Sequence, residues 1–169
     1  MTAQLKDGQI IETEVVLVSI GRGLNSGGIG LEQLGVQTGR RGEILVNEHM
    51  QTSMPGIYAI GDVTGKAMLA HVASAQGKVA VEHILGHRTS MQYDVVPAGI
   101  FTLPEIGRVG LTEAQARERH ETKSSASNGG LKIGRFRYTA LGKAQATGET
   151  TGFCKIISDA PSGKILGVH

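Results

Sequence analysis

Cysteine is nearly absent from this sequence: the chain contains one, Cys154. A lone cysteine excludes both an internal disulfide framework and a redox-active pair of cysteines within the chain. It fits a reducing compartment, so the cytoplasm is the expected location. Cys154 lies in an apolar stretch typical of a strand, where a small core residue is a commoner role for cysteine than a reactive thiol.

Aromatic residues are also scarce, at 4% with no tryptophan, and the net charge is only +2. Lysine and arginine are scattered, so nothing resembles the basic surface of a nucleic-acid binder. Long apolar runs are missing too, since the longest, at residues 15–18, is far shorter than the ~20 residues that cross a bilayer. Met1 is followed by no basic or apolar leader, so we expect neither a signal peptide nor a membrane partner.

Glycine is abundant, with 25 of the 169 residues, and hydrophobic residues make up 40%. This composition is typical of a globular chain with many tight turns. The Asp7-Gly8 dipeptide predicts a hairpin. The β-branched run at residues 15–20 predicts a strand buried on both faces, as in a parallel α/β sheet. Further short elements are expected at residues 31–35 (one helical turn), 44–46 and 57–60 (strands).

A helix is predicted at residues 67–85, where apolar positions and Gln76 keep the spacing of one helix face. Gly86 is placed to end it. Gly77 in its middle costs up to ~1 kcal/mol relative to alanine, so we expect a packing reason for it. His83 and His87 are four residues apart, but the helix is expected to end between them. No cluster of carboxylates or cysteines accompanies them, so no metal site is predicted.

After about Tyr93, where we place a domain boundary, the pattern changes to strands joined by short turns. Thr112 and Gln115 have the spacing of a capping box and predict a helix that runs to about His120. A polar loop is expected at residues 124–130. The expected strands are residues 98–103, 131–138, 152–157 and 165–168. The predicted fold class is therefore α/β followed by α+β with an antiparallel sheet.

Asp62 is the first candidate binding residue, because it follows a predicted strand and precedes a helix. A carboxylate at the end of a strand can accept hydrogen bonds from sugar-like hydroxyls. Gly61 would let the backbone approach a ligand closely. The helix start offers backbone N–H groups to a negatively charged atom. On these grounds alone, an aspartate that merely caps a turn is an equally good interpretation.

Residues 52–63 resemble the second FAD-binding motif of the pyridine nucleotide–disulfide oxidoreductases. The resemblance implies that Asp62 binds the ribityl chain of FAD, with Gly61 beside it. Met68, Leu69, Ala70 and His71 match the stretch whose backbone lies under the flavin ring. This stretch favours the dihydrolipoamide dehydrogenase branch of the family over the mercuric and glutathione reductase branches, which remain the alternative.

Residues 16–25 resemble the family's segment leading out of the NAD-binding domain, and Gly21 matches the glycine that approaches the nicotinamide cofactor. Leu24 and Gly23 depart from the family pattern there, and a plain strand-ending glycine is the alternative role for Gly21. Residues 97–113, 141–146, 152–157 and 163–169 resemble the dimerisation domain in order. The resemblance therefore implies three parts: the end of an NAD domain at 1–24, an FAD-domain return segment at 25–93, and an incomplete dimerisation domain at 94–169.

The family's catalytic groups have no match in this chain. It has no Gly-x-Gly-x-x-Gly fingerprint, no pair of redox cysteines and no His-x-x-x-x-Glu acid/base pair. We therefore assign no catalytic residue and expect a fragment that is inactive alone, although FAD and NAD are the cofactors of the parent enzyme. The expected partners are a second copy and the acyltransferase core of a 2-oxo acid dehydrogenase complex. A non-catalytic dimerisation or docking module is the alternative function.

Overall fold

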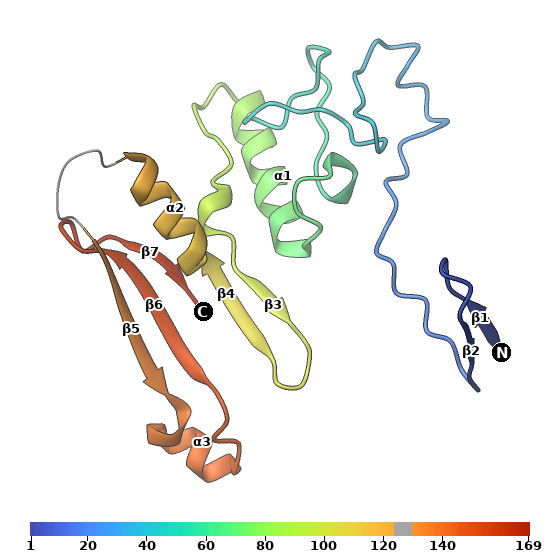
Figure 1. Cartoon of the computed structure of the whole chain (residues 1–169). Coiled ribbons are helices and arrows are strands. Elements are labelled where there is room, and N and C mark those ends of the chain that lie inside the picture. The colour runs from blue at the N-terminus through green and yellow to red at the C-terminus, as the bar shows by residue number, and fades with distance from the viewer. Residues whose placement is uncertain (124–129) are drawn as a thin grey trace.

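The structure is a computed structural model that describes residues 1–123 and 130–169. Figure 1 shows three regions along the chain: an N-terminal hairpin, a central loop region packed on one helix, and a C-terminal sheet. The hairpin and the sheet lie at opposite ends of the sequence, and the candidate site falls in the central region. In the described part of the chain, no helix combines the length and apolar character needed to cross a bilayer.

The N-terminal hairpin consists of β1 (Thr2–Gln4) and β2 (Ile10–Glu12), which pair antiparallel with Thr2 opposite Glu12. Gly8 has a φ of 86° and donates its N–H to the Leu5 carbonyl at 3.0 Å. The glycine tolerates this positive φ, which is the reason the Asp7-Gly8 turn closes there. The predicted hairpin is confirmed, with shorter strands than expected.

Residues 15–20 form no strand, so the prediction of a doubly buried strand is wrong for this chain. The side chains of Leu17 and Ile20 are 87% and 93% exposed. In Figure 1 the segment is an extended, unpaired stretch that leads away from β2. A β-branched run becomes a strand only where a neighbouring strand satisfies its backbone N–H and C=O groups, and no strand within residues 1–123 and 130–169 pairs with it.

The central region, residues 24–69, is mostly irregular and folds around a small apolar cluster of Leu31, Val36, Ile44 and Ala59. The helical turn predicted at 31–35 is confirmed as a turn. The strands predicted at 44–46 and 57–60 are reduced to isolated bridges, one between Thr38 and Ile44 and one between Gln51 and Tyr58. Ile44 and Ala59 do reach the core, whereas Leu45 and Ile60 are exposed, and no continuous ladder forms around them.

Helix α1 (Ala70–Ile84) confirms the predicted helix, although it begins three residues later than expected. Leu69 is extended, with φ −132° and ψ 132°, and serves as the N-cap. Gly86 ends the helix as predicted, with a φ of 85° and an N–H bond to the His83 carbonyl. A Cβ on Gly77 would lie 3.4 Å from Ile60 Cδ1, a contact that an alanine could make, so the packing reason for that glycine stays a prediction. The buried face of α1 consists of Val72, Gln76, Val79 and Ala80.

The C-terminal sheet has five strands in the order β3-β4-β7-β6-β5, and every neighbouring pair is antiparallel, as predicted. Ile157 is fully buried in it, and Cys154 is half-buried opposite Phe136. The strands are β3 (Ala98–Ile100), β4 (Ile106–Gly110), β5 (Leu131–Arg137), β6 (Phe153–Asp159) and β7 (Ile165–Val168).

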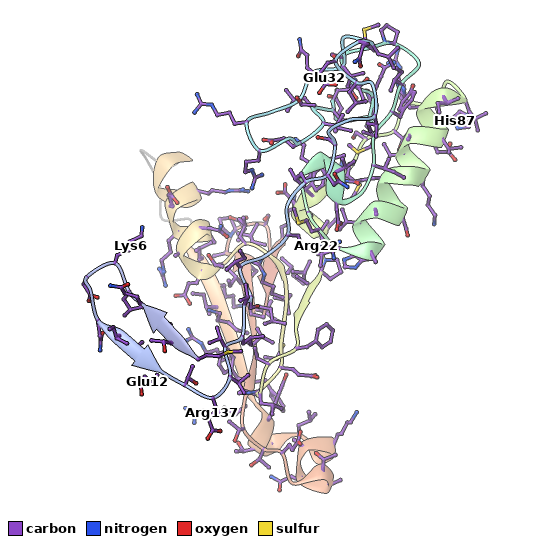
Figure 2. The ribbon with its side chains drawn as sticks, turned by 90° about the vertical axis from the view of Figure 1, so that its right-hand side faces the viewer. Lys6, Glu12, Arg22, Glu32, His87 and Arg137 are labelled. Atoms are coloured by element: carbon purple, nitrogen blue, oxygen red, sulfur yellow. The ribbon has the colours of Figure 1, made fainter. Side chains whose placement is uncertain are left out.

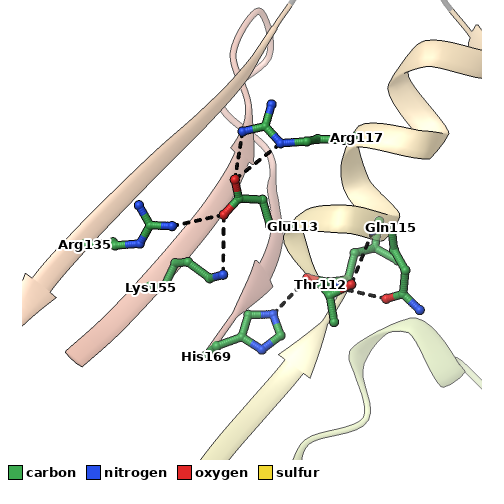
Figure 3. A network of polar contacts seen from close by, with 8 residues as sticks. Thr112, Glu113, Gln115, Arg117, Arg135, Lys155 and His169 are labelled. Atoms are coloured by element: carbon green, nitrogen blue, oxygen red, sulfur yellow. Dashed lines mark hydrogen bonds and ion pairs between the residues drawn. The ribbon is translucent and has the colours of Figure 1, made fainter. Parts of the chain in front are cut away.

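Helix α2 (Glu113–Lys123) packs beside this sheet, and a short helix α3 (Gly142–Thr147) follows β5. Figure 3 shows Glu113, at the start of α2, facing Arg117 and two cations of the sheet, Arg135 and Lys155. The short 3-10 turns are η1 (Asp62–Thr64), η2 (Tyr93–Val95) and η3 (Tyr138–Ala140).

Strand β4 and helix α3 were not predicted. β4 contains two glycines, so its sequence is a poor strand signal, and its place between β3 and β7 defines it. Strand β3 is shorter than the predicted 98–103. Of the polar loop predicted at 124–130, residues 124–129 lie outside the described residues.

Candidate functional site

The candidate site is built on the turn at Gly61, whose backbone N–H and C=O groups both form hydrogen bonds. Gly61 is buried, with φ 78° and ψ −158°. Its N–H donates to Gln76 Oε1 at 2.6 Å. Its carbonyl accepts from the backbone N–H of Thr64 at 3.0 Å and from Thr64 Oγ1 at 2.8 Å. The backbone that carries Asp62 is therefore fixed on its N-terminal side by helix α1 and by the η1 turn.

Asp62 presents its carboxylate at the surface of this turn. Its side chain is 45% exposed, and Oδ2 lies 3.6 Å from Nε of Arg22, which is 77% exposed. Figure 2 shows Arg22 on the loop that passes this region. An ion pair as exposed as this one contributes at most about 1 kcal/mol, because water screens it. The carboxylate is thus accessible and only weakly engaged by its partner.

The first turn of α1 follows Asp62 closely in the sequence. It packs against the backbone turn at Gly61. A Cβ on Gly61 would lie 3.5 Å from the Ala73 Cβ. Leu69 provides no side-chain hydrogen bond to the helix end. Val72 and Ala73 donate their N–H groups to the Leu69 carbonyl at 3.0 Å, so in the described part of the chain the N–H groups of Ala70 and His71 are the ones that keep the capacity to bind a negatively charged atom. Met68, Ala70 and His71 are exposed, so this helix end is open at the surface.

His71 also ties this helix end to the C-terminal sheet. Its Nε2 donates to the carbonyl of Pro97 at 2.9 Å, just before β3 begins. The position of the helix start is therefore coupled to the entry into the sheet.

The structure brings together most of the residues predicted for the site. Gly61, Asp62 and residues 68–71 lie on one turn and the helix that follows it. A Cβ on Gly61 would make only an ordinary van der Waals contact with Ala73 of α1, so the feature that favours glycine there is its φ of 78°. Gly21 is exposed, with φ 91°, and lies next to Arg22, the partner of Asp62. Its predicted contact with the nicotinamide cofactor stays a prediction.

Sequence reasoning missed four residues that support the site: Arg22, Thr64, Gln76 and Tyr93. Gln76 is fully buried and joins Gly61 to the hydroxyl of Tyr93, which accepts from Gln76 Nε2 at 2.9 Å. A signal was present, because a buried glutamine on an otherwise apolar helix face needs polar partners. The pattern does not say which partners they are.

The two histidines considered for a metal have other contacts. His83 Nδ1 lies 2.7 Å from the Tyr58 hydroxyl, and its ring stacks on His49 at 4.5 Å between centroids. His87 pairs with Glu82. Among the residues that the structure describes, no three His, Cys, Asp or Glu side chains gather as metal ligands would.

Two family models match the chain. The model of the pyridine nucleotide-disulphide oxidoreductases matches residues 1–77, and the model of their dimerisation domain matches residues 96–169. The dihydrolipoyl dehydrogenase of Chlamydia muridarum is 46% identical over 163 residues, which cover 96% of this chain and 33% of that protein. The dihydrolipoyl dehydrogenase of Bacillus subtilis is 46% identical over 167 residues, which cover 97% of this chain and 33% of that protein. The chain thus spans about a third of the length of these relatives.

Solved structures of similar fold cover nearly the whole chain. LpdA from Mycobacterium tuberculosis aligns with a TM-score of 0.85 at 32% identity, over 99% of this chain and 35% of its own. The Cu(II) complex of the HOCl-induced flavoprotein disulfide reductase RclA from Escherichia coli aligns with a TM-score of 0.83 at 25% identity. The alignment covers 99% of this chain and 37% of that protein. With the Asp62 turn, the helix end and the antiparallel sheet in place, the chain belongs to the pyridine nucleotide-disulphide oxidoreductase family.

Proposed function

We propose that this chain supplies one wall of the FAD site and part of the subunit interface of a dihydrolipoyl dehydrogenase. The observation that carries the proposal is the half-exposed Asp62 carboxylate, carried by a turn that packs against the first turn of α1, whose end has no side-chain cap. The relatives named dihydrolipoyl dehydrogenase, which match over almost the entire chain, support this activity over that of other disulfide reductases.

The residues present suit the chemistry of a flavin cofactor. The Asp62 carboxylate accepts hydrogen bonds from hydroxyls, as the ribityl chain requires. The α1 end, with Met68, Leu69, Ala70 and His71, would stabilise negative charge on a reduced ring through the N–H groups of Ala70 and His71. When bound, FAD passes electrons between an enzyme disulfide and NAD. In this chain the residues of the wall would bind and orient the flavin cofactor. Gly21 is the residue proposed to approach the nicotinamide.

The chain alone is expected to show no oxidation of dihydrolipoamide by NAD. It has one cysteine, so the enzyme disulfide has to come from elsewhere, and it has no His-x-x-x-x-Glu pair. Without a Gly-x-Gly-x-x-Gly fingerprint to hold the ADP half of the cofactor, the isolated chain is expected to bind FAD weakly.

The domain boundaries and the partners that we propose are those that membership of the family implies. Residues 1–24 end the NAD domain, 25–93 form the FAD-domain return segment, and 94–169 form the dimerisation domain. The dimerisation-domain match supports a homodimer formed through these last residues. The acyltransferase core of a 2-oxo acid dehydrogenase complex is the proposed larger partner. The cytoplasm is the proposed compartment, since a lone cysteine suits a reducing environment.

A second candidate is a non-catalytic dimerisation module that carries a residual nucleotide-binding wall. The missing redox cysteines favour it, because they remove the chemistry while the antiparallel sheet remains intact.

A chimera separates the two functions. Residues 1–169 replace the matching third of the Bacillus subtilis dihydrolipoyl dehydrogenase, which keeps its own redox groups. The chimera is expected to purify with bound flavin and to oxidise dihydrolipoamide with NAD. Asp62→Ala is expected to weaken FAD affinity about 10- to 100-fold, as the loss of hydrogen bonds to a charged group implies. The measurement is a titration of apoprotein with FAD.

Glu32→Gln is the control for that titration, because it removes an exposed carboxylate from a distant turn. It is expected to leave the FAD affinity within about twofold, as is usual for surface substitutions. A dimeric chimera that binds no flavin would favour the non-catalytic module. An Asp62→Ala variant with unchanged affinity would reject the proposed wall.

A further inference from the structure

Gln76 is an unusual residue for its place in the fold. It lies in the middle of α1 on the face formed with Val72, Val79 and Ala80, and it is fully buried. A buried side-chain amide is tolerated only where its polar atoms find partners, since each unpaired group pays its full desolvation penalty. Both polar atoms of Gln76 have partners, and these partners lie in two different segments of the chain.

The orientation of the Gln76 amide is set by its neighbours. The Gly61 N–H is a donor in every state, so it requires the oxygen, Oε1, which lies 2.6 Å away. Nε2 then faces Tyr93, whose hydroxyl accepts at 2.9 Å and directs its own proton toward Met50 Sδ at 3.9 Å. A flipped amide would set a donor against the Gly61 N–H. The Gly61 N–H therefore fixes which atom Gln76 presents to the turn, and the Tyr93 hydroxyl, which can accept or donate, anchors the other end of the amide.

This chain of contacts ends at Gly61, the residue directly before the one whose carboxylate is proposed to face the flavin. Gly61 has a positive φ and precedes Asp62 directly, so the direction of the Asp62 side chain depends on how the Gly61 peptide is held. Thr64 holds the carbonyl side of Gly61, and Gln76 holds the N–H side. Tyr93 belongs to η2, between α1 and β3, so the contact reaches the junction with the C-terminal sheet.

We infer that Gln76, anchored by Tyr93, is a positioning residue for the cofactor wall: it holds the Gly61 N–H and so aims the Asp62 carboxylate. The inference rests on the proposed function for its flavin side. The claim that Gln76 holds the Gly61 N–H concerns the chain without cofactor. This claim and the claim about flavin binding are tested separately.

The first arm measures amide hydrogen exchange of Gly61 by NMR in the 169-residue chain without cofactor. Gln76→Leu removes the acceptor and is expected to speed Gly61 exchange about tenfold or more, as loss of one buried hydrogen bond implies. Exchange at Val79 and Ala80, farther along α1, is expected to change less than about twofold, since their N–H groups bond to backbone carbonyls of the helix, which the substitution leaves in place. Gln76→Glu keeps an oxygen toward Gly61 while the Tyr93 hydroxyl turns to donate, so protection is expected to be retained.

Gln145→Leu is the matched control, because it makes the same change in α3, where Gln145 Nε2 donates to the Thr139 carbonyl. It is expected to leave Gly61 unchanged. If Gln76→Leu fails to fold, Tyr93→Phe decides: it removes the partner that anchors Gln76 Nε2 and is expected to speed Gly61 exchange several-fold. Unchanged Gly61 exchange in the variant that folds overturns the inference. An equal loss of Gly61 protection in Gln76→Glu and Gln76→Leu also overturns it.

The second arm measures FAD dissociation in the chimera described above. Gln76→Leu is expected to speed dissociation about tenfold and Gln76→Glu to restore it, a rescue that a purely packing role for residue 76 would not give, because leucine fills the same space. A chimera that binds no flavin counts against the proposed function and leaves the exchange result standing. Normal flavin dissociation in a Gln76→Leu chimera with a loosened Gly61 overturns the positioning role.

Discussion

Glu113 gathers three cationic side chains at the first turn of α2. Its carboxylate lies 2.7 Å from Arg117 Nη2, 3.1 Å from Arg135 Nη2 and 3.5 Å from Lys155 Nζ (Figure 3). The hydrogen bond from Arg117 holds the pKa of Glu113 below its ordinary value of 4.5, against partial desolvation and with help from Lys155. Since Arg135 and Lys155 belong to β5 and β6, one carboxylate links the helix to two strands.

This arrangement makes a pH-dependent contribution to stability. The pKa of Glu113 is lower in the folded chain than in the unfolded one, so its stabilisation is present above about pH 4.5 and is lost as pH falls through the lower folded value. Glu113→Gln is expected to lower Tm by about 1–3 °C at pH 7, a small change because the site is solvent-screened, and by less at pH 3. Thermal unfolding followed by circular dichroism at both pH values measures this.

Glu149→Gln is the control for that comparison, because it removes the same charge from an exposed loop. A Tm difference between wild type and Glu113→Gln that grows as the pH falls would contradict the assigned direction.

At the scale of the element, α2 has the start that its sequence predicts. The Thr112 N–H donates to Gln115 Oε1 at 3.0 Å, and the Gln115 N–H donates to Thr112 Oγ1 at 3.3 Å, which confirms the capping box. His169 Nε2 donates to the Leu111 carbonyl at 2.9 Å and ties the same helix start to the end of β7. Local sequence sets the cap, and the sheet sets where the capped helix lies.

Removal of the cap is expected to weaken α2 by a predictable amount. Thr112→Ala leaves the Gln115 N–H without its side-chain acceptor and is expected to cost about 1 kcal/mol in the free energy of unfolding. Urea denaturation measures this cost. Thr151→Ala, at an exposed position before β6, is the matched control and is expected to be near neutral. Equal stability of the two variants would show that the box contributes nothing.

At the scale of the whole molecule, much apolar surface is uncovered. Five of the six residues at 15–20 are large and apolar, and Leu17 and Ile20 are almost fully exposed. Exposed apolar patches of this kind favour association, because burial removes them from water. The isolated chain is therefore expected to self-associate as its concentration rises.

Two substitutions test the source of that association. Leu17→Lys with Ile20→Lys is expected to weaken association about tenfold, since it removes two large apolar side chains from the contact. Thr13→Lys with Ser19→Lys adds the same charge to neighbouring exposed positions and is the control. Sedimentation velocity over a concentration series gives the measurement. A wild-type chain that stays monomeric throughout, or an equal effect of both pairs, would refute the expectation.

The sequence by itself determined those features whose physical cause is local. The Asp7-Gly8 turn, the Gly86 helix end and the capping box at Thr112 depend on a few neighbouring residues, so they appear as predicted. The motif around Asp62 likewise pointed to the turn that carries the candidate carboxylate.

Only the tertiary structure decided which distant groups meet. It showed that residues 15–20 lack a neighbouring strand, that β4 exists because β3 and β7 flank it, and that Gln76 joins Gly61 to Tyr93. A strand depends on its partners' backbone groups, and a buried amide depends on groups 15 and 17 residues away. Such pairings are set by how the chain folds back on itself, which the periodicity of a single segment does not encode.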